Sequence, residues 1–365
     1  MNWRNTLLQK DDPYPKTRID KLQAMLTALS LDGCLIEHPV DLTYLTGLNL
    51  SAGALVVMQE ECALFVDGRY EEYAKAYSSH PVLPWGDSSM ASFIKSKKGK
   101  TVAFDQKRTS YERFLQLETL SQKAGCKFLA HHSFSQDLRM CKDLKEFSLL
   151  RQSAHLNWQG YQHIVSLLQE GVSEEELAWE YELFCRTHGA EKLAFSPIIA
   201  FGKNSALPHH RSSKTRLKQG DVVLIDIGVV VGQYCSDMTR TQFFSDVDPT
   251  IKELYNIAEE AQKAALALCR PGVKIGMLDI AAREVMKRYG VEELFLHSLG
   301  HGVGLEIHEA PRIKKDGIDA GTLLVEGMCI TIEPGLYLSG RGGVRYEDTI
   351  FITKEGYENL YPENR

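Results

Sequence analysis

The sequence predicts an α/β (α+β) protein of two domains, the second of which consists of two similar halves. At ~100 to 200 residues per domain, a chain of 365 residues suggests two domains. Amphipathic helices alternate with short apolar strands over residues 18–136, which is typical of a small α/β domain. Beyond residue 143 the order helix, helix, strand, hairpin occurs twice, which indicates an internal duplication. We expect an accessory domain over residues 1–138 and a second domain over residues 143–365.

The composition excludes several classes of protein. The 44% hydrophobic and 25% charged residues are ordinary for a folded protein. A net charge of −6, with no basic cluster more pronounced than 95–100, argues against nucleic acid or an anionic membrane as partner. No apolar run approaches the ~20 residues of a membrane helix. Met1–Asn5 leads into a polar stretch without a signal core, and the eight scattered cysteines fit reduced thiols, so we expect a cytoplasmic protein.

The elements of the accessory domain follow from periodicity. A helix is expected over 21–29, and strands over 33–36, 53–58, 63–66 and 101–104. A domain boundary follows near 140–143.

In the first half of the second domain, a helix over 144–170 ends at Gly171. Ser173 and Glu176 form a capping-box pattern that opens a second helix, which Gly189 can close. A strand over 194–201 follows, and then a hairpin over 221–244.

The second half repeats this order. Helices are expected over 249–269 and 276–289, where Pro271-Gly272 and Gly290 stop them. A segment at 297–307 then leads to two apolar arms, 328–338 and 344–353.

The first hairpin brings two aspartates together. Asp226 interrupts an otherwise apolar run, where an unpaired charge is costly. If Gly232-Gln233 forms a two-residue loop of the glycine-first type, Asp226 faces Thr239 and Gly228 faces Asp237. Asp226 and Asp237 are then diagonal neighbours on one face, so their carboxylates converge. We expect the missing side chain at Gly228 to leave room for ions; the alternative is that both aspartates lie on a solvated surface.

The second hairpin repeats this pattern with Glu333 and Glu347, each within an apolar strand. His301 is a fifth candidate because the glycines around it allow close backbone approach. Four crowded carboxylates repel one another and take up protons unless cations neutralise them. Four carboxylates and one imidazole suit hard divalent ions, Mn²⁺ above all, so the residues predict a site for two dications.

These residues resemble the motifs of the proline-specific metallopeptidases of the pita-bread fold, prolidase and aminopeptidase P. Asp226 and Asp237 stand eleven residues apart, as in the first metal motif of that family. Gly300–Leu305 together with His308-Glu309 resembles the family's histidine motif, and Ile332–Gly335 and Arg345–Asp348 resemble its two glutamate motifs. Tyr44–Gly47 and Val66–Tyr70 resemble segments of its creatinase-like accessory domain.

The resemblance implies a pita-bread fold for the second domain and a set of metal ligands. Asp226 would hold one ion, His301 and Glu333 the other, and Asp237 and Glu347 would bridge them. Mn²⁺ is the first expectation, with Co²⁺ and Zn²⁺ as alternatives. His209, His297 and His308 would line the substrate site, although each histidine taken alone is more often an ordinary surface or core residue.

The implied reaction is hydrolysis of the bond before proline, a tertiary amide that has no N–H. Glu333 would carry a proton to the departing nitrogen, and His308 and His297 would steady the oxyanion. Arg345 and Thr239 would not bind the metal ions themselves but would orient the side chains that do. His210 is expected to be a surface residue.

Arg312 is a candidate for gripping the carboxylate of a dipeptide, since a guanidinium matches a carboxylate in shape and charge. The alternative is a solvated arginine. The sequence leaves open whether Xaa-Pro dipeptides or longer peptides are cleaved, and whether the accessory domain supports a homodimer.

Three rival interpretations remain. Methionine aminopeptidases share the five ligands but usually lack the accessory domain. Creatinase shares the two-domain build without the metal-binding carboxylates. A binding module of the same fold would have lost its ligands, whereas all five are present here.

Overall fold

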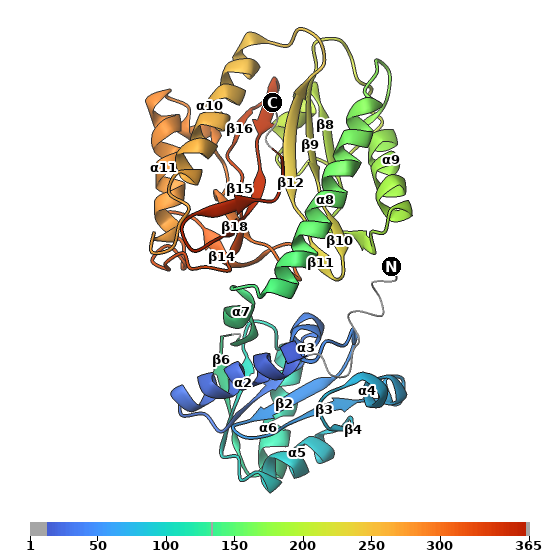
Figure 1. The fold of residues 1–365 in the computed structure, drawn as a ribbon, viewed down its shortest axis with the longest axis vertical. Helices are drawn as coiled ribbons and strands as arrows, with labels where there is room; N and C mark the ends of the chain where they lie inside the picture. Colours follow the sequence, from blue (N-terminus) through green and yellow to red (C-terminus); the bar gives the residue numbers. More distant parts are fainter. Residues whose placement is uncertain (1–12, 133, 363–365) are drawn as a thin grey trace. The chain divides into compact units, whose positions relative to one another are not determined.

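The computed structural model describes residues 13–132 and 134–362. The chain divides into two compact units, Met1–Arg139 and Met140–Arg365, coloured blue to cyan and green to red in Figure 1. The expectation for Met1–Asn5 lies outside the described residues. Among the residues that are described, no helix has the length and apolar character needed to span a membrane.

The N-terminal unit contains a six-stranded sheet in the order β4-β3-β2-β1-β5-β6. The pair β1 and β2 is antiparallel, whereas β1 and β5 are parallel. All four expected strands are present within one residue of their expected limits, and the expected helix is the second half of α2. The strands are β1 (Gly33–Ile36), β2 (Ala54–Met58), β3 (Cys62–Val66), β4 (Val82–Pro84), β5 (Thr101–Asp105) and β6 (Lys127–His131); the helices are α2 (Pro13–Ala28), α3 (Pro39–Thr46), α4 (Glu71–Tyr77), α5 (Asp87–Ser96), α6 (Tyr111–Ala124) and α7 (Phe134–Arg139).

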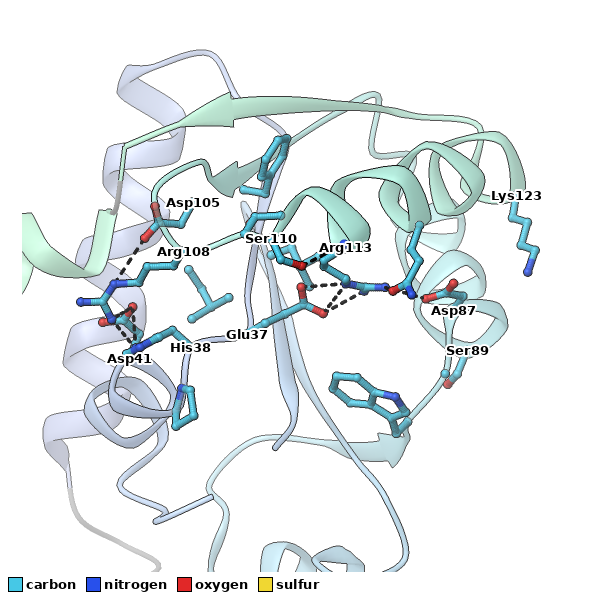
Figure 2. A pocket seen from close by; sticks show the side chains of 18 of the residues that line it. Glu37, His38, Asp41, Asp87, Ser89, Asp105, Arg108, Ser110, Arg113 and Lys123 are labelled. Carbon is cyan, nitrogen blue, oxygen red and sulfur yellow. Dashed lines mark hydrogen bonds and ion pairs between the residues drawn. The ribbon is translucent and has the colours of Figure 1, made fainter. Parts of the chain in front are cut away.

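A cavity of about 990 Å³ opens in this unit beyond the carboxyl ends of β1 and β5 (Figure 2). Two arginines in its wall pair with carboxylates of the same wall. Arg113 Nη2 lies 2.8 Å from Glu37 Oε1, and Arg108 Nη1 lies 3.1 Å from Asp41 Oδ2. The charges of these arginines are therefore balanced within the unit itself.

The C-terminal unit begins with α8 (Leu144–Ser166) and α9 (Glu174–Thr187), each opened by a capping box. The capping box predicted at Ser173 and Glu176 is confirmed, because the Ser173 side chain accepts from the Glu176 N–H and the Glu176 side chain accepts from the Ser173 N–H. The strands of this half are β7 (Lys192–Leu193), β8 (Ile198–Phe201), β9 (Val222–Ile227), β10 (Val229–Val231), β11 (Tyr234–Cys235) and β12 (Met238–Phe243).

The second half begins with α10 (Pro249–Leu266) and α11 (Ile275–Arg288). Figure 1 shows α10 and α11 on one side of the strands and α8 and α9 on the other. Each helix pair packs an apolar core against the strands of its own half. The strands of the second half are β13 (Gly300–Gly302), β14 (Glu309–Ile313), β15 (Cys329–Ile332), β16 (Gly335–Leu338), β17 (Gly342–Arg345), β18 (Asp348–Ile352) and β19 (Tyr357–Asn359).

The first hairpin has the expected register but a different turn. Asp226 pairs with Thr239, and Val231 pairs with Tyr234 on either side of the turn. Gly232 has φ 55° and Gln233 has φ 73°, so both central residues are left-handed. The glycine-first turn, which requires positive φ only at its first position, is therefore the wrong prediction. The register was still correct because both turn types connect the strands through two residues.

The second hairpin keeps a single register through two ladders. Ile332 pairs with Asp348 in the β15–β18 ladder, and Gly335 pairs with Arg345 in the β16–β17 ladder. Between the two ladders, the same register places Glu333 opposite Glu347. The two glutamates therefore lie together at the interruption of the hairpin.

Candidate active site

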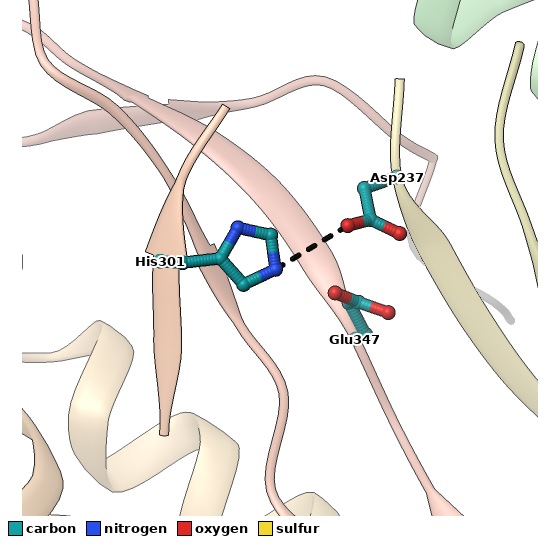
Figure 3. A group of neighbouring side chains, drawn as sticks. All are labelled: Asp237, His301 and Glu347. Atoms are coloured by element: carbon teal, nitrogen blue, oxygen red, sulfur yellow. Dashed lines mark ion pairs between the residues drawn. The ribbon is translucent and has the colours of Figure 1, made fainter. Parts of the chain in front are cut away.

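Buried acidic side chains gather where the two hairpins meet. Thr239 of the first hairpin forms a β-bridge with Glu347 of the second, and the Glu347 N–H donates to the Thr239 carbonyl at 3.1 Å. Figure 3 shows Asp237, Glu347 and His301 pointing toward one another, and one ligand atom from each lies within 4.8 Å of the others. Residues from three strand segments, far apart in the sequence, thus form one cluster.

His301 presents a free lone pair to this cluster. Its Nδ1 bonds to the Gly302 carbonyl at 3.0 Å, and because a carbonyl only accepts, Nδ1 carries the proton. Nε2 lies 3.4 Å from Asp237 Oδ2 and 3.5 Å from Glu333 Oε1. Burial lowers the pKa of His301 to about 3, so the imidazole is neutral. A neutral imidazole with one ring N–H held by a carbonyl is the usual state of a metal-binding histidine.

Glycine at position 300 lets the strand that carries His301 lie close to β15. A Cβ there would lie 2.0 Å from the Thr331 carbonyl oxygen. Any larger residue would push β13 away and move the imidazole. The glycines around His301 thus allow the close backbone approach that the sequence suggested.

Asp226 sits at the other side of the cluster, against Arg345. The Arg345 Nη2 group forms an ion pair with Asp226 Oδ2, and both residues are buried. The other carboxylate oxygen, Oδ1, is buried without a hydrogen-bond partner among the described residues. This ion pair is therefore part of the protein interior, and one oxygen of Asp226 is left without a partner among the described residues.

Thr239 links these side chains. It faces Asp226 in the register, but its hydroxyl donates to Glu347 Oε2 at 2.6 Å. The same hydroxyl accepts from Arg345 Nε at 2.9 Å. Thr239 thereby orients Glu347 and Arg345 together, which is the kind of supporting contact that the sequence led us to expect.

Burial raises the pKa of every carboxyl group in the site, and for three of them the neighbouring carboxylates add to the effect. Burial and the nearby Glu347 raise the pKa of Asp237 well above its usual value. The same two causes raise the pKa of Glu333, and burial with the charge of Asp226 raises that of Glu347 to about 8. Burial also raises the pKa of Asp226, although Arg345 opposes the effect.

These residues fit a divalent-cation site. Oxygen donors predominate, one neutral imidazole adds nitrogen, and one buried carboxylate oxygen has no hydrogen-bond partner in the part of the chain that the structure describes. The single arginine leaves the four carboxylates short of positive charge. Cations bound here would supply the missing charge and lower these raised pKa values.

The space beside Gly228 is filled, which corrects the expected room for ions. A Cβ on Gly228 would lie 2.2 Å from the Ser236 carbonyl oxygen and 2.8 Å from Phe195 Cε1. The Phe195 ring comes from the segment between β7 and β8, which the hairpin register alone does not reveal. The candidate cation site is therefore the cluster of carboxylates itself and not the space beside Gly228.

His297 is held at both ring nitrogens. Nδ1 donates to the Ser298 carbonyl at 2.8 Å, so Nε2 accepts from the Tyr337 hydroxyl at 2.9 Å. Burial and Arg345 lower the pKa of His297 to about 4, which keeps the ring neutral. No N–H is left to steady an oxyanion, contrary to the role expected for His297.

Tyr337 is a site residue that the sequence analysis missed. Its hydroxyl accepts from Arg345 Nη1 at 2.7 Å while it donates to His297. A Cβ on Gly335 would lie 2.4 Å from the Tyr337 hydroxyl oxygen, so that glycine makes room for it. The only indication in the sequence was a tyrosine two residues after a glycine in an apolar strand, and such a tyrosine is typical of an ordinary core residue.

His308, His209 and Arg312 are exposed. The His308 ring meets the His301 ring edge to face, with centroids 4.3 Å apart. Burial lowers the pKa of His308, Asp226 raises it, and His209 and Arg312 lower it further, so these groups are neighbours. Arg312 is opposite His301 in the β13–β14 pairing.

His210 is not the surface residue that we expected. Its Nε2 lies 2.8 Å from Glu174 Oε2, and the Glu174 side chain is completely buried. Glu174 also accepts from the Phe201 N–H at 2.8 Å. His210 therefore helps to join α9 to β8.

Comparison with known families agrees with this architecture. The family described as Metallopeptidase family M24 matches residues 148–354, which is more than half of the chain. The chain belongs to metallopeptidase family M24. The Creatinase/Prolidase N-terminal domain matches residues 18–141. The predicted fold class, a creatinase-like domain followed by a pita-bread domain, is confirmed.

Individual relatives extend over nearly the whole chain. The Xaa-Pro dipeptidase of Pyrococcus furiosus is 37% identical over 352 residues, covering 96% of this chain and 99% of that protein. The structure of a Xaa-Pro dipeptidase from Bacillus anthracis has a TM-score of 0.90 and 31% identity, covering 96% of this chain and 99% of that chain. The structure of an X-Pro aminopeptidase from Thermotoga maritima has a TM-score of 0.85 and 31% identity, covering 95% of this chain and 99% of that chain.

Membership of this family makes the protein a hydrolase of the metallopeptidase class, for which divalent metal ions are implied. The acidic cluster of Figure 3 is the candidate site for them. This result argues against the alternative of a binding module that has lost its metal-binding side chains.

Proposed function

We propose that this protein is a dinuclear-metal exopeptidase that hydrolyses Xaa-Pro bonds, with Xaa-Pro dipeptides as its main substrates and short Xaa-Pro peptides as secondary ones. The observation that carries this proposal is the convergence of four carboxylates and one neutral imidazole around a deficit of positive charge; three of these carboxylates are buried, and Glu333 is partly buried. The near full-length likeness to proteins named Xaa-Pro dipeptidase supports the substrate class.

The proposed metal ligands divide into three groups. Asp226 would hold one ion, His301 and Glu333 the other, and Asp237 and Glu347 would serve both. Mn²⁺ suits this oxygen-rich set, with Co²⁺ or Zn²⁺ as alternatives. When bound, two divalent ions polarise a carbonyl group and lower the pKa of water so that hydroxide forms near neutral pH.

The chain's own residues would bind and orient the substrate. His308 is exposed beside His301, where its ring can donate a hydrogen bond to the oxyanion that forms at the attacked carbonyl. Glu333 would carry a proton to the departing proline nitrogen, a task that suits a carboxyl group of raised pKa. His209 would line the substrate site beside His308. His297 would not contact substrate but would help to orient Arg345 through the Tyr337 hydroxyl.

Arg312 favours dipeptides over longer peptides. Its guanidinium forms no ion pair with the residues that the structure describes, and its backbone N–H donates to Asp319 Oδ2 at 2.8 Å. A proline with a free carboxylate could therefore bind the guanidinium. In a longer peptide the carboxylate lies at least one residue further away.

Two further properties are part of the proposal. The eight cysteines all lie among the described residues and are thiols, not disulfides, which supports a reducing, cytoplasmic location. A homodimer is proposed because the accessory domain of such enzymes often contributes to one. Methionine aminopeptidase activity is the alternative, but the match of residues 18–141 to a creatinase/prolidase domain speaks against it.

Turnover of Gly-Pro and of Gly-Pro-Gly with added Mn²⁺ tests the proposed function. We expect release of free proline from Gly-Pro, a lower kcat/KM for Gly-Pro-Gly, and no activity after chelation. Gly-Ala and Met-Ala serve as controls and should not be cleaved. Cleavage of Met-Ala peptides without cleavage of Gly-Pro would favour the methionine aminopeptidase alternative.

A further inference from the structure

A buried ion pair lies behind the two histidines of the site. Lys142 Nζ donates to Glu309 Oε1 at 2.8 Å, and the two side chains are 1% and 2% exposed. Lys142 precedes the N-cap of α8, and its backbone N–H donates to the Gly327 carbonyl at 2.8 Å. Neither charge belongs to the proposed metal ligands or to the groups that contact substrate.

Stability alone does not account for this pair. Removing two charges from water costs about as much free energy as their mutual attraction returns, so apolar replacements of buried pairs are often neutral or stabilising. The position of the pair offers another explanation, because Glu309 directly follows His308. Glu309 is also paired in register with Gly302, which directly follows His301.

The chain between the two histidines closes around the Glu309 carboxylate. The β13–β14 register shifts between His301 and Gly302. A Cβ on Gly304 would lie 2.4 Å from Glu309 Oε1, so this turn packs directly against the carboxylate. The Gly304 carbonyl accepts from the Cys235 N–H at 2.8 Å, which ties the turn to the first hairpin.

We infer that Lys142 and Glu309 are positioning residues that fix the turn 302–308 and, through it, the placement of His301 beside His308. Lys142 anchors the carboxylate from the start of α8, and the carboxylate in turn fills the inside of the turn. The edge-to-face contact of the two imidazoles, with centroids 4.3 Å apart, depends on this arrangement. This inference rests on the proposed function for its catalytic readout and on the proposed metal ligand His301 for its spectroscopic one.

The double variant Lys142→Met/Glu309→Leu separates positioning from stability. Because it removes both charges, we expect an unfolding temperature close to that of the wild type. The histidines lose their fixed spacing, so kcat for an Xaa-Pro dipeptide should fall by roughly 10- to 100-fold, the scale on which a 1 Å misplacement acts. KM should change less than kcat.

The visible absorption spectrum of the Co²⁺-loaded protein supplies a second readout that does not depend on peptide hydrolysis. Displacement of His301 should alter this spectrum in the double variant. Leu177→Ala is the matched control, since Leu177 is fully buried in α9 and takes no part in the site. We expect this control to lower the unfolding temperature while its spectrum and kcat stay at wild-type values.

A double variant with wild-type kcat and spectrum would overturn the inference. If the double variant does not fold, Glu309→Asp decides, because it retracts the carboxylate by one methylene and keeps its charge. Glu309→Asp should alter the spectrum and lower kcat, and wild-type values for both would overturn the inference. If the wild-type protein cleaves no Xaa-Pro bond, the proposed function fails, and the Co²⁺ spectra still test the positioning role.

Discussion

Glu347 and Asp348 are adjacent on one strand segment, yet their charges are balanced in different ways. Asp348 Oδ1 lies 2.6 Å from Nη2 of the fully buried Arg240, and Asp348 Oδ2 accepts from Gln262 Nε2 at 3.0 Å. Glu347 points to the other side, as alternation along a strand requires, and joins the acidic cluster. There, four carboxylates share Arg345 as their one directly contacting cation among the described residues.

The difference shows what the chain leaves for a ligand to supply. Where a buried carboxylate lies outside the acidic cluster, the chain provides a cation for it, as Arg240 does for Asp348 and Lys142 does for Glu309. At the site the chain does not balance the charges, and the carboxyl pKa values rise. Bound divalent cations would supply the missing charge. The predictions that follow test this contrast, from the largest expected effect to the smallest.

Asp237→Ala should have the largest effect on activity. It removes the carboxylate proposed to serve both ions, so we expect metal loss and a decrease in kcat beyond the ~10² to 10³ that loss of one transition-state donor costs. Elemental analysis and dipeptide turnover measure the two effects.

Asp348→Asn is the matched variant on the other face of the strand. It leaves Arg240 with a neutral partner, so it should lower the free energy of unfolding, toward the about 3 to 5 kcal/mol cost of breaking a buried pair, while the folded protein keeps its metal. A metal-free Asp348→Asn together with a fully active Asp237→Ala would reverse the contrast.

Glu333→Gln should separate metal binding from proton transfer. The amide oxygen can still bind a cation, but the side chain no longer carries a proton. Metal content should partly persist while kcat falls by about 10² to 10⁴, the usual contribution of general acid–base catalysis. Full retention of kcat would remove Glu333 from the proton-transfer role.

His308→Ala should keep the metal and lower kcat by ~10² to 10³, as expected for loss of an oxyanion donor. His301→Ala is the matched variant, because the two rings are in contact but only His301 points Nε2 into the cluster. His301→Ala should lose metal. Metal loss in His308→Ala together with metal retention in His301→Ala would mean that His308 is the metal ligand and His301 is not.

Arg312→Ala should have the smallest effect. Loss of a charge-assisted hydrogen bond of ~1.5 to 3 kcal/mol would lower kcat/KM for Xaa-Pro dipeptides by roughly 10- to 150-fold. Tripeptides should lose less, since their carboxylate lies further on. Equal losses for both substrates, or none, would remove Arg312 from substrate recognition.

The sequence predicted those parts of the site that local geometry determines. The pairing of Asp226 with Thr239 followed from a two-residue turn, and alternation then placed the carboxylates. Long-range packing was not predictable in the same way. Phe195 fills the space beside Gly228 from another segment, and no local pattern indicates this contact.

Partners brought together from distant segments were missed for the same reason. Lys142 looks like a solvated lysine before a helix cap, but its partner Glu309 lies 167 residues further along the chain. His210 looks like a surface residue until Glu174 is placed beside it. The resemblance to a known family pointed to the proposed metal ligands, but it did not reveal the contacts that hold them.

The pH dependence of the Mn²⁺-induced shift in unfolding temperature tests the central claim most directly. In the metal-free protein, folding raises the pKa of Glu347 from 4.5 to about 8, and those of Asp237 and Glu333 well above their usual values. The stability from these protonated groups is fully present below their unfolded pKa values and is lost as the pH rises through about 8. Mn²⁺ competes with those protons.

We therefore predict that the unfolding temperature of the metal-free protein falls from pH 5 to pH 8.5, and that Mn²⁺ raises it little at pH 5 and most at pH 8.5, with two ions bound per chain. A shift that is absent, or that is the same at every pH, would contradict the claim that divalent cations supply the charge this site lacks.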